Sequence, residues 1–217
     1  MFESAMLGHK IDKETFKVEV PKLRAALLEA QEKLRENGTF PVIILISGVD
    51  GSGKGDTINT LYEWMDPRYM STRTFSAPTQ EERQRPSMWR FWRALPKKGR
   101  IGIAAGSWYS WPVADRIAGD LSRSDFDQRM DELNRFEEML VNEGALVLKF
   151  WIHLSKDAQR ERLASIEANP LTRWRVTKAS WDRLKTYDKM QEVAGHLLRT
   201  TNTPWAPWVV VEGTDDR

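Results

Sequence analysis

The apolar positions along the chain follow two kinds of pattern. Continuous apolar runs rich in β-branched residues occur at 41–47, 101–105, 145–153 and 207–212, and a weaker one occurs at 71–75. Such runs, without alternation, are typical of strands buried on both faces of a parallel sheet. Between them, apolar residues recur at spacings of three and four, the period of an amphipathic helix.

The segments with this helical spacing are predicted as helices. They cover 55–65, 79–94, 112–122, 124–143, 155–167, a segment from Pro21 to the Asn37-Gly38 dipeptide, and a last one ending near Arg199. Pro21 occupies a position typical of a first helical residue, and Ser124 with Asp127 resembles a capping box. Strands that alternate with helices predict an α/β fold, a three-layer αβα sandwich around a mostly parallel five-stranded sheet.

The chain reads as one principal domain with a short extension. Residues 1–20 are mixed and polar, and we expect them to form an N-terminal arm lying on a domain of residues 21–217. A basic segment at about 169–190 interrupts the helices and is predicted to be a lid. The sequence ends at Arg217, directly after the last predicted strand at 207–212. A core strand normally leads into a covering helix, so we expect the chain to be a fragment of a longer protein.

The composition narrows the classes of function. The 217 residues include no Cys and only three His, which excludes disulfides and thiolate metal sites and disfavours a His-based metal site. The longest apolar run is far shorter than the roughly 20 residues that a membrane helix needs. A net charge of +2 is too small to indicate nucleic-acid binding by itself. We therefore expect a cytoplasmic protein with no membrane or nucleic-acid partner.

A glycine-rich segment gives the sharpest chemical signal. It has the form G-x-x-x-x-G-K, follows a strong predicted strand and opens a helix, as a phosphate-binding P-loop does. Inward backbone amides and the positive end of the helix attract oxyanions, and the lysine reaches the phosphate. The alternative is a glycine-rich turn that binds nothing. The predicted phosphate-binding residues are Gly48, Asp50, Gly51, Ser52, Gly53, Lys54, Gly55 and Asp56.

Two positions of this loop depart from the usual nucleotide-hydrolase pattern. Gly55 stands where Ser or Thr normally holds magnesium. Asp50 places a carboxylate beside phosphates, which is repulsive unless a metal or a proton lies between them. Asp50 is therefore a candidate Mg²⁺ ligand or an acceptor-orienting base, and the alternative is an aspartate that stabilises the turn.

Two basic segments accompany the loop. Residues 83–100 contain seven basic residues and no acidic one, with Trp and Phe interleaved, and Arg90 is the phosphate-binding candidate there. Arg173 and Arg175 flank Trp174 in the predicted lid, where an arginine can stabilise a transferred phosphoryl group. The alternatives are a solvated helix face for the first segment and a charged helix–helix turn for the second.

These motifs together resemble the polyphosphate kinase 2 family. The shared features are the G-x-D-x-x-G-K loop, Trp89-Arg90, the run from Leu95 to Ile103, Ser107-Trp108-Tyr109, and the closing run from Ala206 to Glu212. The resemblance implies a P-loop kinase-like fold, inorganic polyphosphate as donor, AMP as acceptor giving ADP, and Mg²⁺ as cofactor. Asp50 and Lys54 match the family's loop, and Arg173 and Arg175 match its lid loosely.

The start of the chain is most similar to the N-terminal half of the family's two-domain, AMP-phosphorylating class. Active members carry Asp-Arg before Ser-Trp-Tyr, and often an Arg two residues after the Tyr. This chain has Ala105-Gly106 and Trp111 instead, so the resemblance implies a degenerate copy with a second homologous domain as partner, or a homo-oligomer. The alternatives are a non-catalytic polyphosphate-binding or scaffold domain and a nucleotide kinase that uses ATP.

Overall fold

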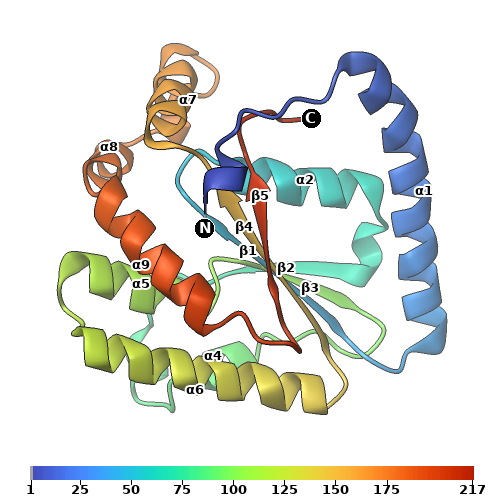
Figure 1. Ribbon diagram of the computed structural model, residues 1–217. Helices are drawn as coiled ribbons and strands as arrows, with labels where there is room; N and C mark the ends of the chain where they lie inside the picture. The colour runs from blue at the N-terminus through green and yellow to red at the C-terminus, as the bar shows by residue number, and fades with distance from the viewer. Residues whose placement is uncertain (1) are drawn as a thin grey trace.

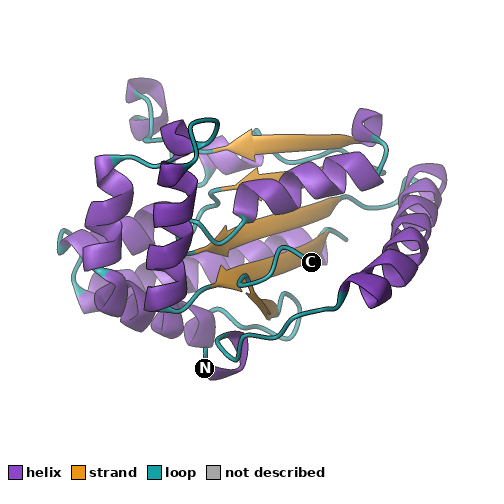
Figure 2. Cartoon of the chain, turned by 90° about the horizontal axis from the view of Figure 1, so that it is seen from above, coloured by secondary structure: helices purple, strands orange, loops and turns teal. Residues whose placement is uncertain are grey.

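A five-stranded sheet forms the centre of the computed structural model, which describes residues 2–217 (Figures 1 and 2). The strands lie in the order β2-β3-β1-β4-β5, and all neighbouring strands are parallel. They are β1 (Val42–Gly48), β2 (Met70–Thr74), β3 (Ile101–Ala105), β4 (Leu146–His153) and β5 (Trp208–Glu212). The predicted α/β fold is confirmed, with a sheet that is parallel throughout.

Helices cover both faces of this sheet. Residues 2–217 form nine α-helices: α1 (Lys13–Asn37), α2 (Lys54–Trp64), α3 (Gln80–Arg83), α4 (Trp89–Trp92), α5 (Ser110–Ala118), α6 (Arg123–Asn142), α7 (Lys156–Ala168), α8 (Lys178–Lys185) and α9 (Tyr187–Thr200). Three short 3₁₀ turns, η1 (Glu3–Ala5), η2 (Pro67–Tyr69) and η3 (Arg173–Arg175), complete the described elements. None of these helices combines the length and the apolar character needed to cross a membrane.

The central strand β1 is buried on both faces, and its side chains divide between two cores. Ile43 and Leu45 point into the core formed mainly with α6 and α9. Ile44 and Ile46 point into the opposite core, which contains Ile58 of α2 and the end of α1. Successive side chains of a strand face opposite sides, so a continuous apolar run serves both layers. Figure 1 shows α1 and α2 on the side of the sheet opposite α6 and α9.

The predicted start of the first helix at Pro21 is wrong. α1 begins at Lys13, because the Asp12 side chain accepts hydrogen bonds of 2.9 Å from the amides of Glu14 and Thr15. An aspartate in this position satisfies amides that the helix itself leaves unpaired. Pro21 lies inside the helix, where it only removes one backbone donor. Residues 13–20, predicted to be an arm, are therefore helical.

Three other predicted boundaries also differ. The helix expected at 79–94 is two short helices separated at Pro86, which cannot continue a hydrogen-bonded helix. The cap expected at Ser124 is instead Ser122, whose hydroxyl accepts from the Asp125 amide at 3.1 Å. The long helix expected to end near Arg199 is interrupted at Thr186 and so forms α8 and α9.

Residues 2–12 do form an arm that lies on the C-terminal half of the sheet. Phe2 is only 4% exposed and stacks on His153 with 4.2 Å between ring centroids. The Gly8 amide donates to Glu212 Oε1 at 2.6 Å. The arm is thus fixed to the ends of β4 and β5, beside the loops that follow the strands.

Candidate phosphate-binding site

The glycine-rich loop connects β1 to α2 at the carboxyl edge of the sheet. Gly48 has a φ of 142°, and a Cβ atom there would lie 2.1 Å from the carbonyl oxygen of Ile152 in β4. Only glycine allows this close approach of the two backbones. Gly53, with a φ of 90°, turns the chain into the first residue of α2. The loop therefore has the curled form that the motif predicts.

The loop offers hydrogen-bond donors to an anion. The Thr57 amide donates to the Gly53 carbonyl at 2.8 Å, so the amides of the residues before it have no acceptor within α2. The Ser52 hydroxyl is buried without a hydrogen-bond partner among the described residues. A buried polar group without a partner is unfavourable. Free amides at a helix start together with an unpartnered hydroxyl fit an oxyanion.

Lys54 holds its ammonium group against the loop. Its Nζ atom donates to the carbonyl oxygens of Val49 at 2.6 Å and Gly48 at 3.0 Å. Burial lowers the pKa of Lys54; the charge of Asp50 opposes this shift and the charge of Arg183 adds to it. A lysine in these surroundings gains from the arrival of a further anion, as the predicted phosphate contact requires.

Three arginines from the segments after β4 pair with aspartates around the loop. Arg162 on α7 donates to Asp216 at 2.8 Å, and its side chain packs 3.4 Å from where a Cβ of Gly51 would lie. Arg175 on η3 donates to Asp56 at 3.1 Å. On α8, the Nε of Arg183 donates to Asp50 at 2.5 Å. Predicted and unpredicted cations are thus brought together over the phosphate-binding loop.

A cleft of about 480 Å³ lies between the loop and α7. Its lining comprises residues 51–56, Arg162, Ser165, Ile166, Asn169, Thr172, Arg175 and Asp216. Of the two predicted lid arginines, Arg175 lines this cleft, whereas Arg173 is exposed on η3 and does not line it. The cleft is wide enough for a chain of phosphate groups and carries cations on two sides.

Arg90, predicted to bind phosphate, lies elsewhere. Its guanidinium donates to the Ser76 carbonyl at 2.9 Å and lies 5.2 Å from the centre of the Phe75 ring. The indole of Trp111 donates to the same carbonyl at 3.2 Å. Two of the Arg90 nitrogens are buried without a hydrogen bond among the described residues. This arginine sits beside the segment after β2 rather than in the cleft.

The end of β3 carries no acidic side chain. Ala105 pairs with Ile46 of β1, two residues before the loop begins, so position 105 lies at the carboxyl edge of the sheet beside the loop. Gly106 follows with a φ of 78°, a left-handed conformation that glycine adopts freely. Residues 105 and 106 therefore supply neither an acid nor a cation at the strand end that adjoins the loop.

The residues present do not fit a protein-held Mg²⁺ ion. Magnesium favours octahedral oxygen ligands, usually one or two carboxylates together with substrate phosphates. Both carboxylates of the loop are already paired, Asp50 with Arg183 and Asp56 with Arg175, and the end of β3 supplies none in their place. Within residues 2–217, no group of three His, Asp or Glu side chains could hold a metal. We therefore assign no metal-dependent step to this chain.

Sequence reasoning missed Arg162, Arg183 and Asp216. The position of Arg162 could have been predicted, because α7 follows β4, the strand next to β1, and the first turns of α7 must therefore pass near the loop. The contact of Arg183 with Asp50 could not have been predicted, since the two residues are 133 positions apart and only the fold of the lid brings them together.

A buried ion pair fixes the Ser107-Trp108-Tyr109 segment behind the site. Glu137 Oε1 accepts from the Trp108 indole at 2.9 Å and from the Tyr109 hydroxyl at 2.6 Å. Its other oxygen accepts from Lys149 at 2.7 Å. Glu137 and Lys149 are both 0% exposed. Burial raises the pKa of Tyr109 and lowers that of Lys149, and the Glu137 charge opposes the shift of Lys149.

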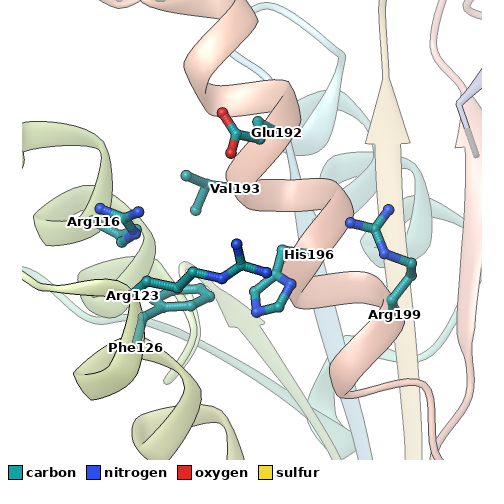
Figure 3. A pocket seen from close by; sticks show the side chains of 7 residues that line it. All are labelled: Arg116, Arg123, Phe126, Glu192, Val193, His196 and Arg199. Carbon is teal, nitrogen blue, oxygen red and sulfur yellow. The ribbon is translucent and has the colours of Figure 1, made fainter.

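A second, smaller pocket lies between α5, α6 and α9 (Figure 3). It has a volume of about 70 Å³ and contains Arg116, Arg123 and His196, with Phe126 on its apolar side. Arg123 extends toward His196, whose ring is hydrogen-bonded to Asp127. It shares no lining residue with the cleft over the loop, so it is not part of the candidate site.

Comparison with known proteins gives consistent matches. The profile described as "Polyphosphate kinase 2 (PPK2)" matches residues 10–217. A polyphosphate:AMP phosphotransferase of Pseudomonas aeruginosa is 48% identical over 217 residues, covering 100% of this chain and 44% of the relative. An AMP/ADP-polyphosphate phosphotransferase of Meiothermus ruber is 31% identical, covering 87% of this chain and 71% of the relative.

Two solved structures share the fold. A crystal structure of a polyphosphate kinase 2 from Pseudomonas aeruginosa has a TM-score of 0.88 at 47% identity, covering 100% of this chain and 44% of that one. A polyphosphate kinase 2 from Arthrobacter aurescens has a TM-score of 0.91 at 27% identity, covering 98% of this chain and 76% of that one. The chain spans less than half the length of the Pseudomonas relatives it matches.

Proposed function

The chain belongs to the polyphosphate kinase 2 family, and from this premise we propose that it is a polyphosphate-binding domain of a polyphosphate:AMP phosphotransferase. The whole protein would transfer a phosphoryl group from inorganic polyphosphate to AMP and release ADP. The observation that carries this proposal is the cleft in which Lys54, the unpartnered Ser52 hydroxyl and Arg175 face the start of α2. A cytoplasmic location and a second homologous domain remain predictions from the sequence.

Binding is the function that the loop and lid support best. Backbone amides at the start of a helix and a lysine above them attract oxyanions of any chain length. Arg162 and Arg175 reach the cleft from two elements, α7 and η3, and planar guanidinium groups are well suited to phosphate oxygens. A polyanion that spans the cleft would contact several of these cations at once.

Transfer by this copy is expected to be weak or absent. The acid and arginine before Ser107 are replaced by Ala105 and Gly106, and Trp111 replaces the cation that often follows Tyr109. Loss of one preorganised group that stabilises developing charge typically lowers a catalytic rate by about 10²–10³-fold. The second candidate function, a non-catalytic binding or scaffold domain that supports an active copy, rests on this same observation.

A direct assay separates binding by this chain from phosphoryl transfer by it. The 217-residue chain is supplied with AMP, polyphosphate and Mg²⁺, and ADP is measured alongside calorimetric binding of inorganic tripolyphosphate. We expect binding without turnover, and Lys54→Met to weaken binding about tenfold or more because it removes a charge at the loop. The matched control is Lys98→Met, since Lys98 is exposed in the segment before β3. Unchanged binding by Lys54→Met would reject the phosphate-binding site.

Turnover by the unaltered chain would reject the degenerate copy, since kinases usually run at about 1–100 per second. Ala105→Asp tests whether the missing acid explains the expected lack of ADP formation, because it places a carboxylate on β3 next to β1. Adding Gly106→Arg returns the cation but places it at a φ of 78°, where a side chain costs about 1–2 kcal/mol. We therefore expect Ala105→Asp alone to produce the first measurable ADP.

A further inference from the structure

Asp50, the candidate metal ligand of the loop, forms an ion pair with an arginine of α8. The Nε atom of Arg183 donates to Asp50 Oδ2 at 2.5 Å. Asp50 is 30% exposed and Arg183 58% exposed, so the pair lies at the edge of the loop and not in the core. A carboxylate beside a phosphate group is repulsive unless a cation lies between them, and a guanidinium supplies that cation.

The pair leaves donors available for an incoming anion. A guanidinium carries five N–H donors in a fixed plane. Within residues 2–217, the only hydrogen bond of the Arg183 side chain is the one from Nε to Asp50. Its two terminal nitrogens are therefore free to donate to phosphate oxygens, while Nε keeps Asp50 neutralised.

The other carboxylate of the loop is paired as well, and the neighbouring strand end supplies none. Asp56 is held by Arg175, and the end of β3 has Ala105 and Gly106 in place of an acid. A divalent ion would thus have to displace Arg183 from Asp50, or Arg175 from Asp56, to reach a bonded carboxylate oxygen of the loop. This donor set favours a guanidinium over a hard octahedral cation.

We propose that Arg183 is a phosphate-site residue that takes the place of a divalent cation, so that this loop binds short polyphosphate without a metal. The inference rests on the proposed polyphosphate-binding function and specifies its chemistry. The proposal predicts that the domain binds polyphosphate more tightly when the polyphosphate carries no metal ion. Magnesium that complexes the ligand lowers its negative charge and weakens its attraction to Lys54, Arg162 and Arg183.

The test is isothermal titration of inorganic tripolyphosphate into the full chain, in EDTA and in excess Mg²⁺. The unaltered chain is expected to bind in EDTA at least as tightly as in Mg²⁺. Arg183→Gln is expected to weaken binding in EDTA about tenfold, because Asp50 is left as an unpaired charge beside the phosphates. Added Mg²⁺ should recover part of that loss, since the freed carboxylate can then take a cation.

Two further variants complete the comparison. Asp50→Asn combined with Arg183→Gln should bind more tightly in EDTA than Arg183→Gln alone, because the repulsive carboxylate is gone. Arg160→Gln is the matched control: Arg160 is 55% exposed on α7 and pairs with Asp157 of the same helix at 2.7 Å, whereas Arg183 pairs with Asp50 of the loop. Its binding should equal that of the unaltered chain. Thermal unfolding of each variant checks that the fold is kept.

Binding of the unaltered chain only in the presence of Mg²⁺ would overturn the inference. Equal binding by Arg183→Gln and Arg160→Gln would also overturn it, and if Lys54→Met still weakened binding, the proposed function would stand. Absence of tripolyphosphate binding in both buffers would instead reject the proposed function itself. Should Arg183→Gln fail to fold, Arg183→Lys replaces it, since the loss of the planar guanidinium donors must weaken binding in EDTA relative to Arg160→Gln.

Discussion

Replacement of Glu137 by Gln tests the buried charge network behind the site. Glu137 lies on α6 and accepts hydrogen bonds from Trp108, Tyr109 and Lys149 at 2.6 to 2.9 Å. Lys149 also donates to the Thr201 carbonyl at 2.7 Å, and both charged side chains are fully buried. Gln keeps the shape of the side chain but removes the negative charge that balances the Lys149 ammonium.

The magnitude follows from the burial. Breaking a buried pair by removing one partner costs about 3–5 kcal/mol, because it leaves an uncompensated charge. For a chain of this size each kcal/mol lowers the unfolding temperature by about 2–4 °C, so Glu137→Gln should lower it by roughly 6–20 °C. The neighbouring Glu138→Gln is the control, since Glu138 is exposed on the same helix and should change little.

Urea unfolding followed by tryptophan fluorescence measures the free energy of unfolding of both variants. In Glu137→Gln, burial lowers the pKa of the unpaired Lys149 below that of the unfolded chain, so the unfolded chain binds more protons at high pH. The free energy of unfolding of this variant should therefore rise as pH is raised toward the ordinary lysine pKa. An effect no larger than that of Glu138→Gln would refute the reasoning, because the pair would then carry no buried charge.

Three further changes probe the site and its surroundings. Burial lowers the pKa of His153 from 6.5 to about 4. Between pH 6.5 and about 4 the unfolded chain therefore binds a proton at His153 that the folded chain does not. The free energy of unfolding should fall by up to about 3 kcal/mol as pH drops through this range. His153→Gln should remove that part of the fall in urea titrations, and equal pH dependence of the two proteins would contradict it. Gly48→Ala, with a Cβ 2.1 Å from the Ile152 carbonyl, should cost at least about 3 kcal/mol in the same titration, and a cost below 1 kcal/mol would show that the loop can move away. Arg162→Gln should weaken tripolyphosphate binding about tenfold by calorimetry, whereas Arg160→Gln should leave it unchanged.

The strands and the loop were predictable because their signals are local. The run from Val42 to Ile46 is apolar at every position, and only a strand with helices on both faces can bury all of it. The glycines that follow it specify the turn through conformations that other residues avoid, as Gly48 and Gly53 show. Neither inference needed knowledge of distant contacts.

Helix boundaries were less predictable where two local signals competed. Asp12 and Pro21 are both residues that favour helix starts, and the structure uses the cap at Asp12 with the proline in the interior. Pro86 carried a breaker signal that the basic, Trp-rich pattern around it obscured. In both places the stronger hydrogen-bond constraint determined the outcome.

The cations of the site could be predicted only in part. Arg175 was recognised from its place in the lid, but its partner Asp56 belongs to the loop and was expected to contact phosphate instead. The pairing of Arg183 with Asp50 depends on how α8 folds back over the loop, and the spacing of residues along the sequence does not predict that arrangement. Whether any of the predicted site residues, the loop residues as well as Arg90, Arg173 and Arg175, contacts a ligand stays a prediction.

The arrangement separates binding from transfer in physical terms. Arg162 of α7 and Arg175 of η3 line the cleft with the loop, and Arg183 of α8 pairs with Asp50 at the loop, so geometry and charge alone can hold a polyanion there. We expect transfer also to need groups at the end of β3, where Ala105 offers no acid, Gly106 adopts a left-handed backbone, and Trp111 directs its donor to the Ser76 carbonyl. An acid restored at 105 would therefore act without the cations beside it, which is why partial rather than full recovery of transfer is the outcome consistent with this structure.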